Sequence, residues 1–418
     1  MDVYVGIDWS EAKHDVVLLN AAGATVAQIT IPHTEAGFQT LRNLCTGAAP
    51  PPSQCHIGIE TKHNLLVDYL WSYGYEQVYV IPPSRVKGCR QRYRSSGART
   101  DASDAYMLAD VVRTDQPHLT LWRPDQPLTQ QMRALVATLH QLTRQSLALA
   151  NQLRALLLRY YPGLLVAFPN LQAQTPLAFL ARYPTPAAAA SITRTEWEQF
   201  LHEQHYGHRQ RAATQFAAFQ QAPLPTTLVT ATVYAEPAQT VAALLCETLQ
   251  AKLAAQKHLT TLFTQHPDHD IFASLPGTGA FLAPALLVCF GDDRQRFPTQ
   301  ASLQAQAGTC PVTEQSGKHR SVHFRRACDR DFRTYAQQWA RASVVRTKSP
   351  FACAFYADLR QRRIPDNQAY RCLANRWLAI AWRLWQTHTT YDEAYHLQQR
   401  SARRQPLPSR GLTVATTA

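Results

Sequence analysis

The stretch that decides the fold is residues 3–8, VYVGID, a short run of strand-forming residues that ends at Asp8. Similar runs follow at 14–20 and 25–31, separated by Ala-Ala-Gly-Ala. Three short runs joined by tight connections predict an antiparallel meander. Helical and strand-like patterns then alternate. The elements expected after the meander are helices at 35–45, 64–72 and 101–112, and strands at 56–60 and 77–81.

A meander followed by alternating helices and strands is the element order of an RNase H-like fold. Such a fold has a mixed sheet with helices on both faces. The remainder of the chain is expected to be mainly helical, so the predicted fold class is α/β plus α. The expected division is 1–115 (acidic α/β domain), 116–265 (helical region with an insertion at about 163–235), 266–390 (C-terminal domain) and 391–418 (a tail expected to be disordered).

Four acidic residues fall at informative positions on this scaffold. Asp8 ends the first strand, Glu60 ends the fourth, and Asp101 and Asp104 are three residues apart at the start of a helix. Two carboxylates 4 Å apart repel by roughly 4 kcal/mol at an effective dielectric of 20. Bound Mg²⁺ or Mn²⁺ removes that cost, and two such ions can clamp a reacting phosphodiester. The alternative is that each acid is an ordinary turn or cap residue, but the order and spacing of all four favour the metal site.

The overall charge points to a polyanionic partner. The 418 residues include 42 Lys plus Arg and 29 Asp plus Glu, which gives a net charge of +13. Residues 82–100 contain no acid, and we expect a mobile loop there that holds a phosphate backbone, the alternative being a merely solvated loop. The cations of this loop are Arg85, Lys87, Arg90, Arg92, Arg94 and Arg99.

Several function classes are disfavoured by composition. The apolar run at 281–290 is about half of what a bilayer requires, and the N-terminus lacks the pattern of a signal peptide, so no membrane association is expected. Nine scattered cysteines without a CxxC pair indicate reduced thiols rather than a zinc cage or a disulfide framework. A cytoplasmic location follows as an expectation.

The middle of the chain contains a long amphipathic pattern. Leucines recur at three- and four-residue steps through 126–161, which predicts a helix of over 30 residues that forms a coiled coil. A second helical stretch at about 236–265 is its expected antiparallel partner. Between them, 163–235 shows helix signals at 176–182 and 194–204, but no function can be assigned to it.

The C-terminal third holds a candidate nucleophile. Residues 274–279, SLPGTG, form a turn that opens a helix and is typical either of a helix-hairpin-helix nucleic-acid contact or of plain architecture. Ser316 follows in a polar turn, SG. A serine that attacks DNA forms a phosphoserine link that keeps the phosphodiester energy, and nearby arginines can neutralise the phosphate oxygens. The alternative is a simple Ser-Gly turn. The cations expected to bind phosphate here are Lys318, Arg320, Arg325 and Arg326.

Taken together, these residues resemble the bacterial transposases of the insertion-sequence 110 family, the DEDD transposases. The resemblance covers roughly 1–160 and 270–390. Its N-terminal motifs are GIDWSEAKHDV with Asp8, GIET with Glu60, and ARTDASDAYMLAD with Asp101 and Asp104. Its C-terminal motifs are SLPGTG, GDDRQRF and AGTCPVTEQSGKHRSVHFRRAC.

The resemblance implies a RuvC-like N-terminal domain, a coiled-coil connection and a C-terminal transposase domain. It implies that the four acids bind Mg²⁺ and that Ser316 attacks DNA, with Ser321 as the fallback. Many relatives have two hydroxyl residues before the glycine, where this chain has Gln315 and Ser316. The family resemblance further implies a structured noncoding guide RNA and homodimers or homotetramers with sites shared between protomers.

The expected function is therefore a DNA transposase or recombinase. Two alternatives stay open. In a junction-resolving nuclease the acids would activate water and Ser316 would be structural. In a non-catalytic protein the basic surface would bind DNA or RNA beside a degenerate acid cluster.

Overall fold

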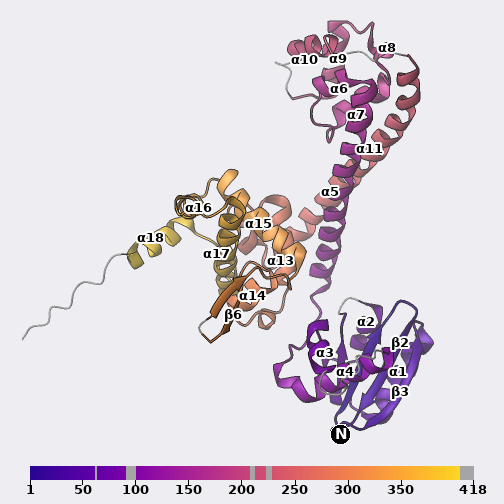
Figure 1. The fold of residues 1–418 in the computed structure, drawn as a ribbon, viewed down its shortest axis with the longest axis vertical. Helices are drawn as coiled ribbons and strands as arrows, with labels where there is room; N and C mark the ends of the chain where they lie inside the picture. Colours follow the sequence, from indigo (N-terminus) through magenta and orange to yellow (C-terminus); the bar gives the residue numbers. More distant parts are fainter. Residues whose placement is uncertain (62–63, 91–99, 208–211, 223–227, 318, 405–418) are drawn as a thin grey trace, which may run out of the picture. The chain divides into compact units, whose positions relative to one another are not determined.

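The computed structural model describes residues 1–61, 64–90, 100–207, 212–222, 228–317 and 319–404 (Figure 1). The chain forms two compact units, Met1–Asp125 and Gln126–Ala418. Each unit has hydrophobic clusters of its own. None of the described helices is long and apolar enough to span a bilayer.

The first unit is built on a five-stranded mixed sheet in the order β3-β2-β1-β4-β5. The predicted meander is confirmed, because β1, β2 and β3 pair antiparallel in sequence order. β4 then pairs parallel to β1, and β5 pairs parallel to β4. The strands are β1 (Val3–Trp9), β2 (Lys13–Leu19), β3 (Thr25–Pro32), β4 (Cys55–Ile59) and β5 (Val78–Val80).

Helices cover both faces of this sheet, as expected. The odd-numbered residues of β1 lie in a core with α1 and α2, whereas α4 packs on β1, β2 and β4 from the other face. The alternation of side chains along a strand explains why β1 serves both layers. The helices are α1 (Glu35–Ala48), α2 (Leu65–Ser72), α3 (Pro83–Arg90) and α4 (Asp101–Asp115).

The expectation of a mobile loop throughout 82–100 was wrong for its first half. Residues 83–90 form α3, and Val86 and Cys89 are buried where this helix packs on α4. These two apolar residues are three apart and therefore share one face of the helix. In the sequence, this short apolar face lies among many cations and gives only a weak helical pattern. Residues 91–99 lie outside the described part of the chain.

The second unit begins with a long helix, as predicted. α5 (Pro127–Tyr160) packs along α11 (Leu228–Thr264), and the chain runs up one helix and returns down the other (Figure 1). The second helix starts earlier than expected, because it continues through Pro237. The predicted helices at 176–182 and 194–204 are present within the segment between them, where the rings of Phe168, Phe179 and Trp197 pack against one another. The helices of this segment are α6 (Pro162–Ala167), α7 (Gln174–Arg182), α8 (Pro186–Ala189), α9 (Arg194–Glu203) and α10 (Ala212–Gln220).

The rest of this unit is a helical bundle with one β-hairpin. The side chains of Trp339, Trp377 and Trp385 are fully buried in its core. α18 occupies a stretch for which disorder was expected. The elements are α12 (His269–Ala273), α13 (Gly279–Phe290), α14 (Gln300–Gln306), β6 (Val312–Ser316), β7 (His319–His323), α15 (Arg330–Val345), α16 (Pro350–Gln361), α17 (Asp366–Thr387) and α18 (Glu393–Arg404).

Asp292, from the GDD turn after α13, connects this bundle to the long helices. Its Oδ1 accepts a hydrogen bond from the Thr129 hydroxyl at 2.8 Å and lies 3.1 Å from Nε2 of His266. Its Oδ2 accepts a hydrogen bond from the backbone N–H of Gln126 at 2.6 Å. One carboxylate therefore joins the start of α5 to the chain just after α11, where it faces the buried side chains of Thr129 and His266.

Candidate functional site

Two of the four predicted acids lie side by side at one edge of the sheet. Ile7 of β1 pairs with Ile59 of β4 in parallel register, and Asp8 and Glu60 each come one residue later. On the other side of β1, Asp8 pairs with Asp15 of β2. Three carboxyl groups therefore gather where β1 and β4 end.

Two glycines allow α4 to lie close to this edge. Gly6 and Gly58 pair with each other, and each precedes an acid by two residues, so glycine and acid share one face of the sheet. A Cβ on Gly6 would meet the carbonyl oxygen of Ala105 at 1.8 Å, and one on Gly58 would meet that of Leu108 at 2.7 Å. The backbone of α4 therefore lies directly on the glycines. The repeated Gly-Ile-acid pattern, GID at 6–8 and GIE at 58–60, is the sequence signal for this close approach, and it was not used in the sequence-based prediction.

The start of α4 brings the other two acids to the site. Thr100 caps the helix: its side chain accepts a hydrogen bond from the Ser103 N–H, and the Ser103 side chain accepts one from the Thr100 N–H. Asp104 is 4% exposed. The Asp101 side chain is 67% exposed and lies 3.8 Å from Nζ of Lys13. The first turn of the helix thus supplies one buried carboxyl group and one that is paired with a lysine.

The pKa of Asp8 responds to the other acids of the cluster. The pKa of Asp8 is raised from 3.8 to about 6, first by burial and then by the charges of Asp104, Glu60, Asp101 and Asp15, in decreasing order. Burial disfavours the charged form of a carboxyl group, and neighbouring negative charges do the same. The structure therefore brings together the residues that the sequence placed on separate strands and a helix.

The donor chemistry of the cluster fits a hard divalent cation. Carboxylate oxygens are the ligands that Mg²⁺ and Mn²⁺ prefer, and the raised pKa of Asp8 reflects a concentration of negative charge that a cation would relieve. The side chains are not arranged as a finished coordination shell: within the described residues, no group of three or more His, Cys, Asp or Glu side chains is placed to hold a metal ion. Asp101 instead makes its ion pair with Lys13.

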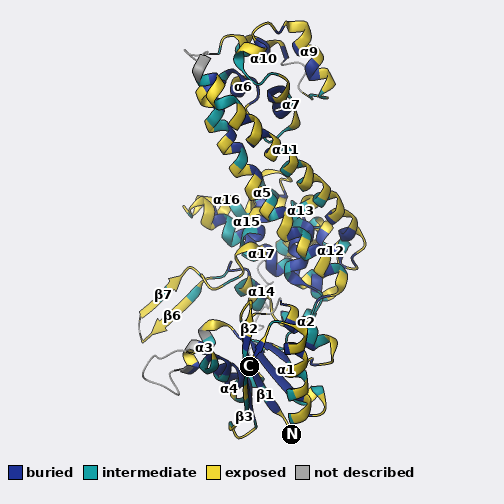
Figure 2. Cartoon of the chain, turned by 90° about the vertical axis from the view of Figure 1, so that its right-hand side faces the viewer, coloured by how far each residue is buried: buried dark blue, intermediate teal, exposed yellow. Residues whose placement is uncertain are grey.

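Ser316 lies at the tip of an exposed β-hairpin in the second unit. It is the last residue of β6 and pairs with His319 of β7, and Gly317 in the turn has a φ of +55°. Figure 2 shows that both strands are largely exposed. The predicted polar turn is present, and the segments that flank it are the largely exposed strands of the hairpin. Ser316 makes no side-chain hydrogen bond within the described part of the chain.

A second hydroxyl on the hairpin has a histidine partner. Oγ of Ser321 lies 2.9 Å from Nε2 of His323, and that same nitrogen lies 3.6 Å from Oε2 of Glu314. Glu314 and Ser321 face each other across the strands. Ser321 therefore has a potential general base that Ser316 lacks among the described residues, which keeps it as the fallback nucleophile.

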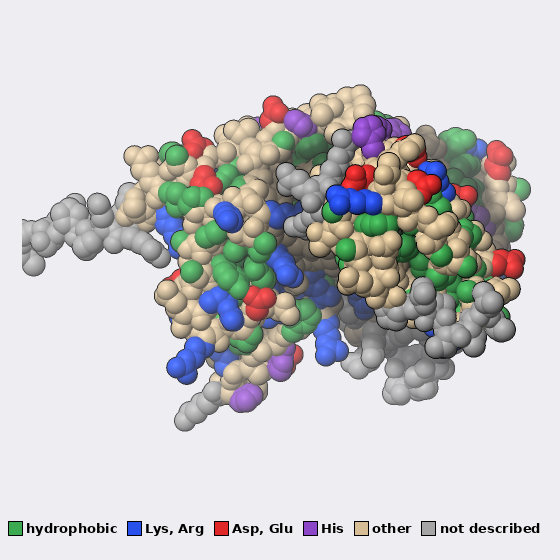
Figure 3. Space-filling view, turned by 90° about the horizontal axis from the view of Figure 1, so that it is seen from above, with side chains coloured by type: hydrophobic (Ala, Val, Ile, Leu, Met, Phe, Trp, Pro, Cys, Tyr) green, Lys and Arg blue, Asp and Glu red, His purple; other side chains and the backbone are tan. Residues whose placement is uncertain are grey.

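The predicted phosphate-binding residues have different surroundings. Arg320 and Arg326 are exposed, whereas Nε of the half-buried Arg325 donates to the carbonyl of Cys310 at 3.4 Å. Nη1 of Arg85 on α3 donates to the carbonyl of His118 at 3.3 Å. Lys87 and Arg90 also belong to α3. Figure 3 shows Lys and Arg side chains spread over the visible face rather than collected in one patch. Lys318, Arg92, Arg94 and Arg99 lie outside the described residues.

The SLPGTG turn is explained by packing. Gly277 has a φ of +86°, and a Cβ there would lie 2.6 Å from the backbone nitrogen of Ser343 on α15. Nε1 of Trp339 donates to the carbonyl of Pro276 at 2.9 Å. Glycine is therefore required for the close approach of the turn to α15, which favours the architectural reading of the motif.

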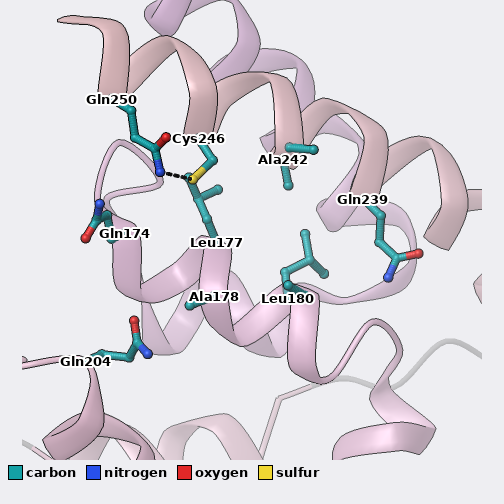
Figure 4. Close-up of a pocket in the computed structure, with 11 residues that line it drawn as sticks. Gln174, Leu177, Ala178, Leu180, Gln204, Gln239, Ala242, Cys246 and Gln250 are labelled. Atoms are coloured by element: carbon teal, nitrogen blue, oxygen red, sulfur yellow. Dashed lines mark hydrogen bonds between the residues drawn. The ribbon is translucent and has the colours of Figure 1, made fainter. Parts of the chain in front are cut away.

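A cavity of about 450 Å³ lies between α7 and α11, and none of the candidate site residues lines it (Figure 4). Leu177, Leu180 and Ala242 supply apolar surface, and glutamines such as Gln174 and Gln250 stand around it. No charged side chain is among the described residues that line it. The cavity is therefore unsuited to holding a phosphate or a divalent cation.

Comparison with known proteins connects the two units. Residues 5–162 match a transposase family model, DEDD_Tnp_IS110, and residues 269–357 match that of the IS116/IS110/IS902 transposase family. The chain is 30% identical to the mini-circle putative transposase for IS117 from Streptomyces coelicolor, over 94% of this chain and 96% of that protein.

Other relatives are similar over 71–94% of this chain. An uncharacterized 42 kDa protein of insertion element IS900 from Mycobacterium paratuberculosis is 26% identical, over 94% of this chain and 98% of that protein. An uncharacterized 43.6 kDa protein of insertion element IS110 from Streptomyces coelicolor is 28% identical, over 71% of this chain and 72% of that protein. With both units matched and relatives spanning nearly the full length, this chain belongs to the IS110 family of transposases.

Proposed function

We propose that this transposase cuts and rejoins DNA strands with a Mg²⁺-binding cluster of four acids in its first unit and a serine nucleophile, Ser316, in its second. The observation that carries the proposal is the gathering of Asp8, Glu60, Asp101 and Asp104 where β1, β4 and α4 meet. Membership in a transposase family supports DNA as the substrate.

Asp8, Glu60, Asp101 and Asp104 would hold the Mg²⁺ or Mn²⁺. When bound, the cation supplies positive charge that stabilises the phosphate oxygens during displacement. Asp8 must be ionised to act as a ligand, and its pKa of about 6 means that it is mostly ionised at neutral pH. The exposed Asp101 carboxylate lies 3.8 Å from Nζ of Lys13.

Ser316 would attack the phosphorus of the scissile phosphodiester. The Oγ–P bond forms, the bond from phosphorus to the leaving deoxyribose oxygen breaks, and the serine proton is passed to that oxygen through a general base or solvent. The phosphoserine link keeps the energy of the broken bond, so a hydroxyl of another strand can reverse the step and rejoin DNA without ATP. Arg320, Arg325 and Arg326 would neutralise the phosphate oxygens.

The RNase H-like (RuvC-like) identity of the first unit, the coiled-coil nature of the α5–α11 pair and the division into three functional regions belong to the same proposal. A structured noncoding guide RNA, and a homodimer or homotetramer that shares sites between protomers, extend it.

The test is to trap a covalent protein–DNA adduct in the presence of Mg²⁺ and to map the modified residue. Ser316→Ala should abolish the adduct, and Ser321→Ala serves as the matched control on the same hairpin. An adduct that persists in Ser316→Ala but disappears in Ser321→Ala would transfer the role to Ser321. Normal cutting by Ser316→Ala would indicate a hydrolytic nuclease, and full strand exchange by Asp8→Asn would refute the metal cluster.

A further inference from the structure

Three segments of the second unit meet at one exposed aromatic ring. Phe324 directly follows β7 and is 45% exposed. The guanidinium carbons of Arg333 on α15 and Arg371 on α17 each lie 5.0 Å from the centroid of its ring. We call Phe324, Arg333 and Arg371 the Arg-Phe-Arg cluster.

The cluster concentrates positive charge. A cation over an exposed aromatic ring gains about 0.5–1 kcal/mol, but the ring does not cancel the charge. Within the described residues, neither arginine forms an ion pair with a carboxylate. The acids at the start of α15 have other partners: Asp329 caps the helix, and Asp331 lies 3.4 Å from Nδ1 of His140. An anion bound between or beside the two guanidinium groups would relieve their mutual repulsion.

The cluster also contacts the base of the hairpin that carries Ser316. Nη1 of Arg333 donates to the carbonyl of Arg325 at 3.4 Å, and Nε of Arg325 donates to the carbonyl of Cys310, two residues before β6. The strand side chains are largely exposed (Figure 2), so contacts at the base of the hairpin fix its direction relative to α15 and α17. A ligand of the cluster therefore lies at the foot of this hairpin.

We propose that Arg333 and Arg371 bind the phosphate backbone of the DNA strand at the foot of the hairpin, and that Phe324 is the positioning residue that holds the two guanidinium groups for this purpose. A guanidinium group that lies against a ring keeps its N–H groups available, and planar N–H pairs match phosphate oxygens. The inference rests on the proposed function, in which DNA is the substrate. The proposed site adds two residues, Arg333 and Arg371, that lie outside the family motifs, whereas Phe324 belongs to one of them. It also includes α17.

The experiment measures binding of a mixed-sequence DNA duplex to the full-length protein as a function of salt concentration. The Ser316→Ala background prevents turnover. Each lost phosphate contact should reduce the slope of log affinity against log salt by about 0.9. We therefore expect a smaller slope for Arg371→Gln, an unchanged slope for Arg371→Lys, and a reduced slope for Phe324→Leu that Phe324→Tyr restores.

Arg341→Gln is the matched control, because Arg341 is an exposed arginine on α15 without a contact to the ring. Its slope should stay close to that of the background protein. Slopes for Arg371→Gln and Phe324→Leu equal to that of Arg341→Gln would overturn the inference while leaving the proposed function in place. A slope change seen with an RNA duplex but not with DNA would also overturn it.

A background protein that fails to bind DNA would instead refute the proposed function. If Phe324→Leu does not fold, as judged by its thermal unfolding transition, the comparison of Arg371→Gln with Arg371→Lys still decides the question.

Discussion

Replacing Asp8 by asparagine should stabilise the metal-free protein at neutral pH. The pKa of Asp8 is raised from 3.8 to about 6, so the folded state binds its proton more tightly than the unfolded state does. Proton binding by Asp8 therefore stabilises the folded state. This stabilisation is fully present below pH 3.8 and is lost as the pH rises through 6. At about 1.4 kcal/mol per pKa unit, the loss is about 3 kcal/mol, an upper value because Asp8 is only half-buried.

The asparagine side chain of the Asp8→Asn variant cannot ionise. The free energy of unfolding of the variant should therefore exceed that of the wild type by an amount that grows from near zero at about pH 4 to about 2–3 kcal/mol at about pH 7. Hydrogen exchange of peptides from β1 and β4, in full-length protein with EDTA and corrected for intrinsic rates, reports the stability of the first unit. Saturating Mg²⁺ should reverse the order, because the wild type gains binding free energy that the variant cannot. A variant that is destabilised at neutral pH, or whose effect does not depend on pH, would refute the electrostatic account of the cluster.

Three further predictions concern packing, the interior polar contacts and metal binding. Gly6→Ala should destabilise the first unit by about 1–3 kcal/mol or prevent its folding, because the new methyl group would meet the Ala105 carbonyl. The control is Gly47→Ala on α1, whose methyl group meets nothing within 4 Å and which should be neutral or slightly stabilising. Urea unfolding of both variants checks this. Asp292→Ala should destabilise the second unit by about 1–3 kcal/mol, because the buried Thr129 hydroxyl and the exposed Gln126 N–H lose this acceptor. Hydrogen exchange at the start of α5 should rise, and unchanged protection there would contradict the role of this carboxylate. Mg²⁺ affinity, measured by titration calorimetry, should weaken as the pH falls through about 6, because protons then compete for Asp8, and a flat profile between about pH 5 and 7 would exclude Asp8 as a ligand.

The sequence alone predicted most of the elements because their signals are local. The meander follows from short strand-forming runs with tight connections, and the long α5 follows from leucines at helical spacing. The order and spacing of the acids marked the candidate site, and the motifs around Asp8 and Ser316 indicated the family.

Local signals failed where a short apolar pattern lay inside a segment dominated by charge. Among the described side chains, the buried face of α3 contains only Val86 and Cys89. The surrounding cations therefore favoured the prediction of a loop over residues 82–100. The hairpin at Ser316 was missed for a related reason. Its strands are exposed, so they carry no alternation of apolar and polar residues.

By itself, then, the sequence determined the strands of the first unit, the principal helices and the identities of the acids and the candidate serine. Only the tertiary structure decided that α4 rests on Gly6 and Gly58, which brings Asp104 to Asp8 and raises the pKa of that carboxyl group. It also decided that Arg333 and Arg371, far apart in the chain, converge on Phe324. The physical reason is that backbone preferences act between neighbours in sequence, whereas close approach and electrostatic coupling depend on distances set by the packed fold.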